Sequence, residues 1–226
     1  MSQTLALIPA YNEETHIAEV VRGARVHLPV LVVDDGSTDG TAATAERAGA
    51  TVLRQVPNQG KGAALRAGFR YALERDYTAV LTLDADGQHD PAEIEKFLRA
   101  HGERQADLII GARTFRDMPF TRRIANTLGT WALTWAIGQP IRDNQSGYRL
   151  IGRRLMEALL ASDESGFEFE VEMVATCVQR GFALDWVAIR TIYAGESSHI
   201  RPWQHIVDFS RVVWQTRRRF RQHKPA

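Results

Sequence analysis

The sequence predicts an α/β fold with a mostly parallel central sheet, helices on both faces of the sheet and amphipathic helices toward the C-terminus. Three observations lead to this prediction. Short segments rich in Leu, Ile and Val alternate with helix-like segments through the first half of the chain. Polar clusters follow three of the apolar segments, as is typical where loops leave the carboxyl ends of parallel strands. From about residue 115 the alternation stops, and helix-like segments with tryptophan follow.

The apolar segments of the first half are expected to be strands, and the segments between them helices. Strands are predicted at residues 5–8, 30–33, 51–54, 79–83 and 108–110. Helices are predicted at residues 13–25, 40–48, 60–74 and 91–100. In the third helix, Leu65, Phe69 and Leu73 recur at i, i+4 and i+8 and form one apolar stripe. In the fourth, Asp90 is an N-cap ahead of Pro91 at the first helical position.

The second half is expected to hold mainly amphipathic helices. A helix spans about 168–180, and a short strand pair follows near 184–193. An earlier helix carries Ile124, Leu128, Trp131, Ala132 and Trp135. The last helix, at 200–220, places on one face Trp203, Ile206, Val207, Val213 and Trp214. From residue 211 onward the chain has six basic residues and no acidic one. The net charge of the whole chain is close to zero, but positive charge is concentrated in this C-terminal segment.

Composition excludes several classes of protein. The 28 Lys and Arg residues against 27 Asp and Glu give a net charge of +1, so the chain as a whole has no bias toward nucleic acid. The single cysteine, Cys177, excludes an internal disulfide and a multi-thiolate metal site and fits a reducing compartment, by default the cytosol. No signal peptide is expected, and the longest charge-free stretch, residues 124–141, is too polar to span a bilayer.

The polar clusters at the expected strand ends are candidates for a ligand site; they occupy residues 9–14, 34–39 and 84–88. The middle cluster is equally well explained as a tight turn followed by a helix cap. Asp84 and Asp86 are harder to explain in this way, because two carboxylates at i and i+2 repel one another unless a cation offsets them. Their hard oxygen atoms suit Mg²⁺ or Mn²⁺, which commonly bridges to substrate phosphates.

A phosphate-bearing ligand needs cationic partners, and the candidates are Lys61, Arg113 and Arg149. Lys61 lies between two glycines at the start of a predicted helix, but the segment matches neither a Walker loop nor a dinucleotide-binding glycine pattern. A plain glycine-rich helix start explains this segment about equally well.

Six blocks of the sequence together resemble glycosyltransferase family 2, and most closely its dolichol-phosphate mannosyltransferase-like branch. The blocks are Pro9-Ala-Tyr-Asn-Glu-Glu14, Val33-Asp-Asp-Gly-Ser-Thr-Asp39, Asn58-Gln-Gly-Lys-Gly62, Asp84-Ala-Asp-Gly-Gln88, Gly111-Ala-Arg113 and Gln145-Ser-Gly-Tyr-Arg149. The resemblance covers about residues 3–195. It implies a GT-A domain at residues 1–195 with a basic amphipathic helix and tail at 196–226, a nucleotide-diphosphate sugar donor, and transfer with inversion.

The resemblance also implies roles for individual residues. Around the base and ribose of the donor would lie Pro9, Tyr11, Glu13, Val33 and Asp35. The remainder of the donor would meet Lys61, Asp84, Ala85, Asp86 and Arg113, with Asp86 and Gln88 at the metal. The acceptor side would be formed by Ser146, Arg149 and His199. The Gln-x-x-Arg-Trp block of processive synthases is missing, because Arg142 is followed by Asp143.

The expected reaction is a direct displacement at the anomeric carbon, with the metal and Arg113 stabilising the departing diphosphate. A polyprenyl phosphate acceptor would need no general base, whereas a hydroxyl acceptor would need one, for which Asp143 is the candidate. GDP-mannose is the favoured donor and UDP-glucose the second. The alternatives are a family 2 transferase acting on a hydroxyl and a non-catalytic sugar-nucleotide-binding protein. A sugar-phosphate nucleotidyltransferase is disfavoured because residues 11–14 are acidic.

Tryptophans close to basic residues bear on the acceptor. Trp131 and Trp135, together with Trp203 and Trp214, resemble the interfacial helices of proteins that lie on a membrane surface. Such a protein would be peripheral on the cytoplasmic face of the membrane, next to its polyprenyl phosphate. The same helix faces could instead pack on the sheet or on a second subunit of a homodimer.

Overall fold

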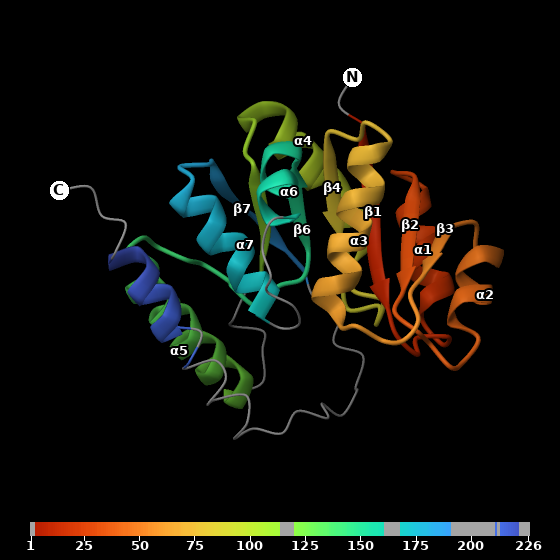
Figure 1. Ribbon diagram of the computed structural model, residues 1–226, viewed down its shortest axis with the longest axis horizontal. Helices are drawn as coiled ribbons and strands as arrows, with labels where there is room; N and C mark the ends of the chain where they lie inside the picture. The colour runs from red at the N-terminus through yellow and green to blue at the C-terminus, as the bar shows by residue number, and fades with distance from the viewer. Residues whose placement is uncertain (1–2, 114–119, 161–167, 191–210, 212, 222–226) are drawn as a thin grey trace.

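A seven-stranded sheet runs through the centre of the computed structural model, with the strand order β3-β2-β1-β4-β6-β5-β7 (Figure 1). The structure describes residues 3–113, 120–160, 168–190, 211 and 213–221. The strands are β1 Thr4–Ala10, β2 Val30–Asp34, β3 Thr51–Arg54, β4 Ala79–Thr82, β5 Leu108–Arg113, β6 Arg149–Gly152 and β7 Leu184–Ile189. The five strands predicted in the first half are confirmed, and so is the mostly parallel α/β sheet.

The direction of the strands brings the polar clusters to one edge of the sheet. Strand β1 pairs in parallel with both β2 and β4, and Ala10 lies opposite Asp34 in this register. Strand β6 is antiparallel to both of its neighbours, β4 and β5, so it is the antiparallel strand of the described sheet. The carboxyl ends of β1, β2 and β4 therefore lie side by side, and the loops that leave them can share a site.

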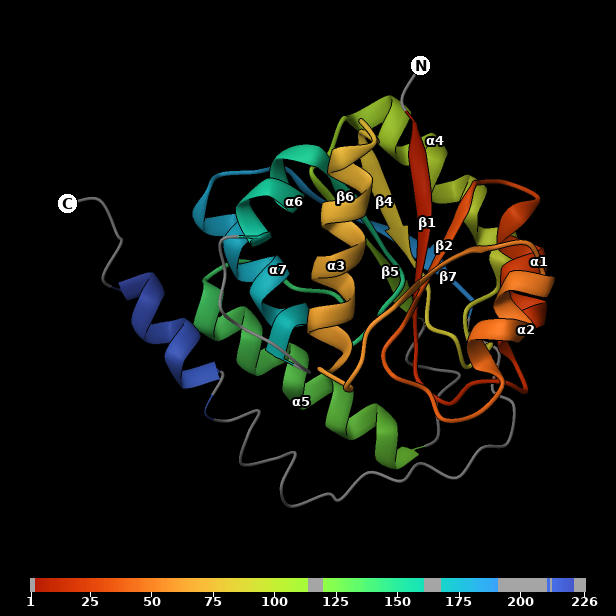
Figure 2. The ribbon, with the colours of Figure 1, turned by 45° about the vertical axis from the view of Figure 1, so that its right-hand side comes forward.

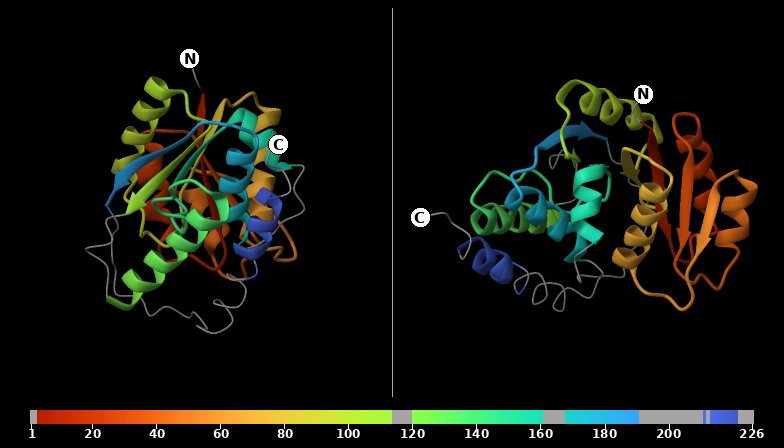
Figure 3. Two further views of the ribbon diagram at one scale, coloured as in Figure 1. Left: turned by 90° about the vertical axis from the view of Figure 1, so that its left-hand side faces the viewer. Right: turned by 45° about the horizontal axis from the view of Figure 1, so that its top comes forward.

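Helices cover both faces of the sheet (Figures 2 and 3). One core cluster packs on the face of α1 Ile17–Arg25, α2 Thr41–Arg47 and α4 Ile94–Arg104. A second cluster packs on the face of α3 Lys61–Glu74, α6 Arg153–Leu160 and α7 Glu168–Gln179. The apolar stripe predicted for α3 is buried there, since Leu65 and Phe69 are 2% and 0% exposed.

Several helix ends differ from the prediction for local reasons. Helix α1 begins at Ile17 instead of residue 13, because the backbone N–H groups of Glu13 and Glu14 bond to the neighbouring loop. The cap at Asp90 is confirmed: its side chain accepts from the Ala92 N–H at 2.9 Å and opens a 3₁₀ turn, Pro91–Glu93, that leads into α4. Strand β6 and helix α6 were not predicted, and only the first residue of β6, Arg149, belongs to a block that was assigned to a ligand site.

Helix α5, Phe120–Ile137, lies at the end of the molecule where β1, β2 and β4 finish (Figure 1). Residues 211 and 213–221 form a helix beside it, joined by a hydrogen bond of 3.0 Å from Arg217 Nη1 to the Trp135 carbonyl oxygen. The expected strand pair is represented by β7 alone in the described chain. Trp203, Ile206, Val207 and the expected domain boundary at 195–196 lie outside the described residues. Among the helices described, none is long and apolar enough to cross a membrane.

We predict that Cys177 of the native protein resists thiol reagents at pH 8. Its side chain is buried on α7, and burial raises the pKa of the thiol to about 12. At pH 8 the reactive thiolate is then about one part in ten thousand. Labelling with a colorimetric disulfide reagent should be absent in buffer and complete in urea, and rapid stoichiometric labelling of the native chain would contradict this burial.

Candidate active site

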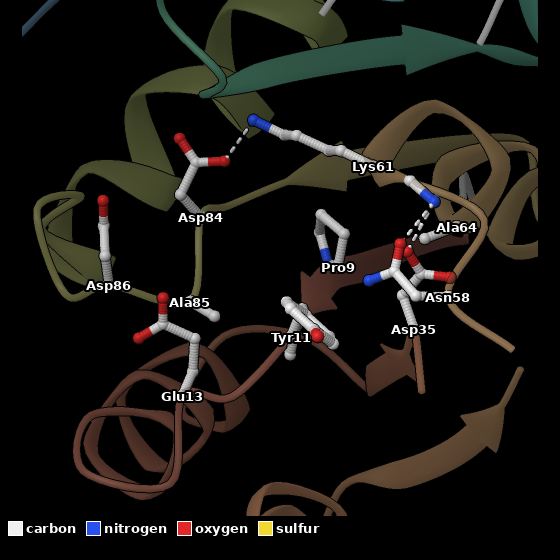
Figure 4. Close-up of a pocket in the computed structure, with 12 residues that line it drawn as sticks. Pro9, Tyr11, Glu13, Asp35, Asn58, Lys61, Ala64, Asp84, Ala85 and Asp86 are labelled. Atoms are coloured by element: carbon white, nitrogen blue, oxygen red, sulfur yellow. Dashed lines mark hydrogen bonds and ion pairs between the residues drawn. The ribbon is translucent and has the colours of Figure 1, made fainter. Parts of the chain in front are cut away.

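A pocket of about 390 Å³ opens at the carboxyl ends of β1, β2 and β4, where α3 begins (Figure 4). It is lined by Pro9, Ala10, Tyr11, Glu13, Asp35, Asn58, Gly60, Lys61, Ala64, Asp84, Ala85 and Asp86. Eight of these are residues predicted to meet the donor. Asp35 and Asn58 lie at one end of the pocket and Asp86 at the other.

The β2 loop is shaped by carboxylates that cap backbone groups. The Ser37 N–H donates to Asp34 Oδ1 at 3.0 Å, and Arg54 Nε donates to Asp34 Oδ2 at 3.1 Å. Asp39 Oδ1 accepts from the Thr41 N–H at 3.0 Å at the start of α2. The turn-and-cap explanation therefore holds for Asp34 and Asp39, and Asp35 is the acidic residue of this loop that lines the pocket.

Hydrogen bonds also tie the β1 loop to the β2 loop. The Asn12 N–H donates to Ser37 Oγ at 2.9 Å, and Asn12 Oδ1 accepts from the Thr38 N–H at 2.9 Å. Asn12 has a φ of 55°, a left-handed conformation that asparagine adopts more readily than most residues. The two loops thus satisfy each other's polar groups and hold Tyr11 and Glu13 at the pocket.

Asp35 fixes the segment that leads into α3. Its buried carboxylate accepts from the backbone N–H groups of Gln59 at 2.9 Å and Gly60 at 2.7 Å. These bonds place Asn58 in the wall of the pocket and direct Lys61 toward the end of β4. Ala10, Asn58, Gly60 and Ala64 were not assigned a role from the sequence, although all of these except Ala64 belong to one of the six blocks.

Lys61 is bound by two carboxylates from distant parts of the chain. Its Nζ lies 2.6 Å from Asp84 Oδ1, at the end of β4, and 2.8 Å from Glu170 Oε1, on α7. Burial alone would lower the pKa of Lys61, but the two carboxylates outweigh it and raise this pKa above its usual value. Burial likewise opposes ionisation of Asp84, but the charge of Lys61 keeps the pKa of Asp84 below its usual range. The cluster is charged at neutral pH.

His89 is buried against the same carboxylate. Its Nδ1 accepts from the Asp84 N–H at 3.0 Å, and its ring centre lies 4.9 Å from that of Tyr148. Burial lowers the pKa of His89 despite the nearby charge of Asp84, so the ring is neutral at pH 7. His89 is 5% exposed, and its ring holds the backbone of Asp84 in place.

The residues at the end of β4 fit a divalent cation held by few protein atoms. Asp86 lines the pocket, and burial followed by the charge of Asp84 raises the pKa of its carboxyl. A cation at Asp86 would relieve that penalty, whereas Asp84 is turned toward Lys61. The described residues contain no group of three or more His, Cys, Asp or Glu side chains arranged around a metal. An ion held at Asp86 would take its other ligands from phosphate and water.

Arg113 and Asp143 form a two-pronged ion pair outside the pocket lining. Arg113 Nε donates to Asp143 Oδ2 at 2.7 Å, and Arg113 Nη2 donates to Asp143 Oδ1 at 3.0 Å. Asp143 is 1% exposed and also accepts from the backbone N–H groups of Arg113 and Gln145. Both oxygens of Asp143 are thus engaged by four donors, and the residue is not among those that line the pocket, so the geometry does not place it as a general base for an acceptor hydroxyl.

Three other residues that were predicted to contact the donor or the acceptor are not among those that line the pocket. Arg149 is 1% exposed, and its guanidinium donates to the backbone carbonyl oxygens of Asn144, Ser146 and Glu170, so it does not face an acceptor as expected. Ser146 is also 1% exposed. Val33 is packed in the core below α3.

The last two predicted site residues are Gln88 and His199. Gln88 is partly exposed, and its backbone N–H donates to Asp86 Oδ1 at 2.9 Å. His199 lies outside the described residues.

The carboxyl ends of the strands of a mostly parallel sheet are where α/β proteins commonly bind ligands, and the polar pocket lies there. Residues 6–159 match the family model described as glycosyl transferase family 2, and the chain belongs to this family. It is 34% identical to a polyprenol monophosphomannose synthase of Mycolicibacterium smegmatis, over 83% of this chain and 76% of that protein. It is 33% identical to an undecaprenyl-phosphate mannosyltransferase of Micrococcus luteus, over 79% of each chain.

A solved structure supports the fold. Glucosyl-3-phosphoglycerate synthase from Mycobacterium tuberculosis, crystallised with Mn²⁺, UDP and glucosyl-3-phosphoglycerate, is similar with a TM-score of 0.70 and 21% sequence identity. The match covers 95% of this chain and 78% of that chain. The expected GT-A fold is thereby confirmed.

We predict that Gly147→Ala disturbs the charged cluster. A Cβ at this position would lie 2.5 Å from Asp84 Oδ2, and it would push the carboxylate away from Lys61. The expected loss is about 1–3 kcal/mol in the free energy of unfolding, because a partner of a buried charge is displaced. Urea unfolding measures it.

Gly102→Ala on α4 is the matched control. A Cβ there meets nothing within 4 Å, and alanine is the better helix former, so stability should stay equal or rise by up to about 1 kcal/mol. Equal unfolding midpoints for the two variants would contradict the proposed packing of Gly147 on Asp84.

Proposed function

We propose that this protein is an inverting glycosyltransferase that moves a sugar from a nucleotide-diphosphate sugar to a polyprenyl phosphate. The observation that carries the proposal is the pocket itself, with hydrogen-bonding groups at the Asp35 end and the partly buried carboxylate of Asp86 at the other. A donor of this class has a base at one end and a diphosphate that needs cations near the other. The names of the two similar proteins support the lipid phosphate as acceptor.

The donor is proposed to lie along the pocket with its base toward Asp35. The carboxylate of Asp35 already orders two backbone N–H groups and has lone pairs left for a nucleobase N–H. Tyr11 is 49% exposed at the pocket, where its ring can cover a base or ribose. GDP-mannose is the favoured donor, in line with the names of the two relatives, and UDP-glucose is the second.

The diphosphate is proposed to lie toward Asp86 and Ala85. Mg²⁺ or Mn²⁺, held by Asp86 with help from Gln88, would neutralise charge on the leaving diphosphate. Arg113 is the proposed cation of the protein, and Asp143 keeps its guanidinium in a fixed orientation. Lys61 is held by Asp84 and Glu170, so its proposed part is to keep Asp84 in place beside the donor.

The chemistry proposed is a single displacement. An oxygen of the acceptor phosphate forms a bond to the anomeric carbon from the side opposite the leaving group, and the bond from that carbon to the diphosphate oxygen breaks. The acceptor oxygen is already ionised at neutral pH, so no residue has to remove a proton. The engagement of Asp143 by Arg113 favours this acceptor over a hydroxyl, which would need a base.

We expect transfer of mannose from GDP-mannose to undecaprenyl phosphate in the presence of Mn²⁺, and none to undecaprenol. The two acceptors share the lipid chain and differ in the phosphate, so the comparison isolates the need for an ionised oxygen. Thin-layer chromatography of labelled sugar in the lipid phase measures the product, with UDP-glucose tested in parallel. Comparable transfer to undecaprenol would contradict the phosphate acceptor, and donor binding without any transfer would favour a non-catalytic binding protein.

Asp86→Asn should lower the rate of metal-dependent transfer by about 100-fold or more, because one preorganised group that stabilises the leaving diphosphate is lost. The folded chain should be as stable as before or more so, since burial already disfavours the charged carboxylate. Transfer rates over a Mn²⁺ titration and thermal unfolding measure the two effects.

Asp76→Asn is the matched control, because this exposed residue has a φ of 58° that asparagine tolerates. Its transfer rate should be unchanged. If Asp86→Asn retains the normal rate and metal requirement, Asp86 is not the metal ligand.

A further inference from the structure

Helix α5 presents apolar side chains on two opposite faces. Its inward face packs into the core through Leu133, Ala136 and Ile137. Its outward face carries Leu128, Trp131 and Trp135 at i, i+3 and i+7, and these are 61%, 70% and 48% exposed. A helix that is apolar all round is normally buried all round. The exposed apolar side chains of the outward face are therefore those expected of a surface that contacts another molecule.

The terminal helix beside α5 gives this surface its charge. Val213 and Thr216 are buried, whereas Trp214 is 64% exposed and Arg218 lies with it on the exposed side. The guanidinium of Arg218 is 5.9 Å from the centre of the Trp214 ring. Arg217 joins the two helices, since its guanidinium lies 4.8 Å from the centre of the Trp135 ring. An open depression between the side chains is lined by Arg211, Trp214, Gln215 and Arg218.

We propose that this tryptophan–arginine face, made of Leu128, Trp131, Trp135, Trp214 and Arg218, docks on an anionic lipid bilayer. Indole rings settle at the level of the lipid headgroups, and guanidinium groups meet the lipid phosphates. Charge selects this occupant: residues 211–221 contain five arginines, of which Arg219 is paired with Glu172 of α7, and neither this segment nor α5 contains an acidic residue. A second copy of the chain would bring the same positive charge to the contact.

The position of the face relates the bilayer to the pocket. Helix α5 lies at the end of the molecule where the pocket-building strands finish (Figures 1 and 2). The segment after α5 is tied to it, because the Ile141 N–H donates to Thr134 Oγ1 at 3.1 Å and Thr130 Oγ1 donates to Asn144 Oδ1 at 3.3 Å. That segment carries Asp143. That the bilayer would present a lipid phosphate to Arg113 rests on the proposed function. Docking of the face on the bilayer does not rest on it.

The test is co-sedimentation of the full chain with vesicles of phosphatidylcholine alone or mixed with phosphatidylglycerol, none containing a polyprenyl phosphate. The chain should sediment with the mixed vesicles at low salt, much less with the neutral ones, and less again as salt is added. Arg218→Gln should weaken binding about fivefold, since a basic residue near an anionic surface contributes about 1 kcal/mol. Trp131→Ala should weaken it as well.

Two substitutions on the opposite side of the sheet are matched controls. Arg99→Gln removes an exposed charge from α4, and Val26→Ala removes an apolar side chain that is 80% exposed after α1. Neither should change vesicle binding. Circular dichroism checks that all four variants are folded.

Three results would overturn the proposal. These are no sedimentation with mixed vesicles at low salt, an equal effect of Arg99→Gln and Arg218→Gln, and self-association in light scattering that Trp131→Ala abolishes while vesicles are not bound. The last result would assign the face to a second copy of the chain. Because the vesicles contain no acceptor, the result is independent of whether the transferase proposal succeeds. Arg218→Gln should also keep normal transfer to a short-chain acceptor in detergent.

Discussion

The ion-pair cluster around Lys61 connects three parts of the fold that are far apart in the chain, and it adds a charged contact to the apolar packing between them. Lys61 begins α3, and Asp84 follows β4. Glu170 lies on α7, 109 residues after Lys61. Removing one member would leave a charge in a partly desolvated site, which proteins tolerate poorly. The cluster therefore fixes the distance between the β4 loop and α7, and with it the side of the pocket on which Asp86 lies.

Glu170 extends this constraint toward the far side of the site. Its carboxylate bonds Lys61, and its backbone carbonyl oxygen accepts from the buried guanidinium of Arg149. The same guanidinium holds the carbonyl oxygens of Asn144 and Ser146, which follow Asp143. Asp143 in turn orients Arg113. Charge-assisted hydrogen bonds and the backbone segments between them thus connect the pocket to the residues proposed to stand near the acceptor. They give Arg149 a positioning role in place of the contact expected from the sequence.

Polar residues at the pocket divide into those that satisfy each other and those that do not. The side chains of Asn12, Asp34 and Asp39 accept hydrogen bonds from backbone N–H groups of the loops, and they shape the rim of the pocket. Asp86 instead faces the pocket with a carboxyl whose pKa is raised by burial. This division explains how one sheet edge can be strongly acidic in sequence and still present a specific place for a cation and a diphosphate.

Local patterns in the sequence determined the strands of the first half, the Asp90 cap and most of the pocket lining. Parallel strands bring their carboxyl ends together, so polar clusters at these ends predict a shared site without further information. Tertiary structure alone decided that Glu170 meets Lys61, that Arg113 is paired with Asp143, and that Arg149 and His89 are buried. It also decided that the tryptophans of α5 face outward. Residues far apart in the chain meet only through the packing of whole helices on the sheet, and periodicity along a helix does not say which of two apolar faces the core will cover.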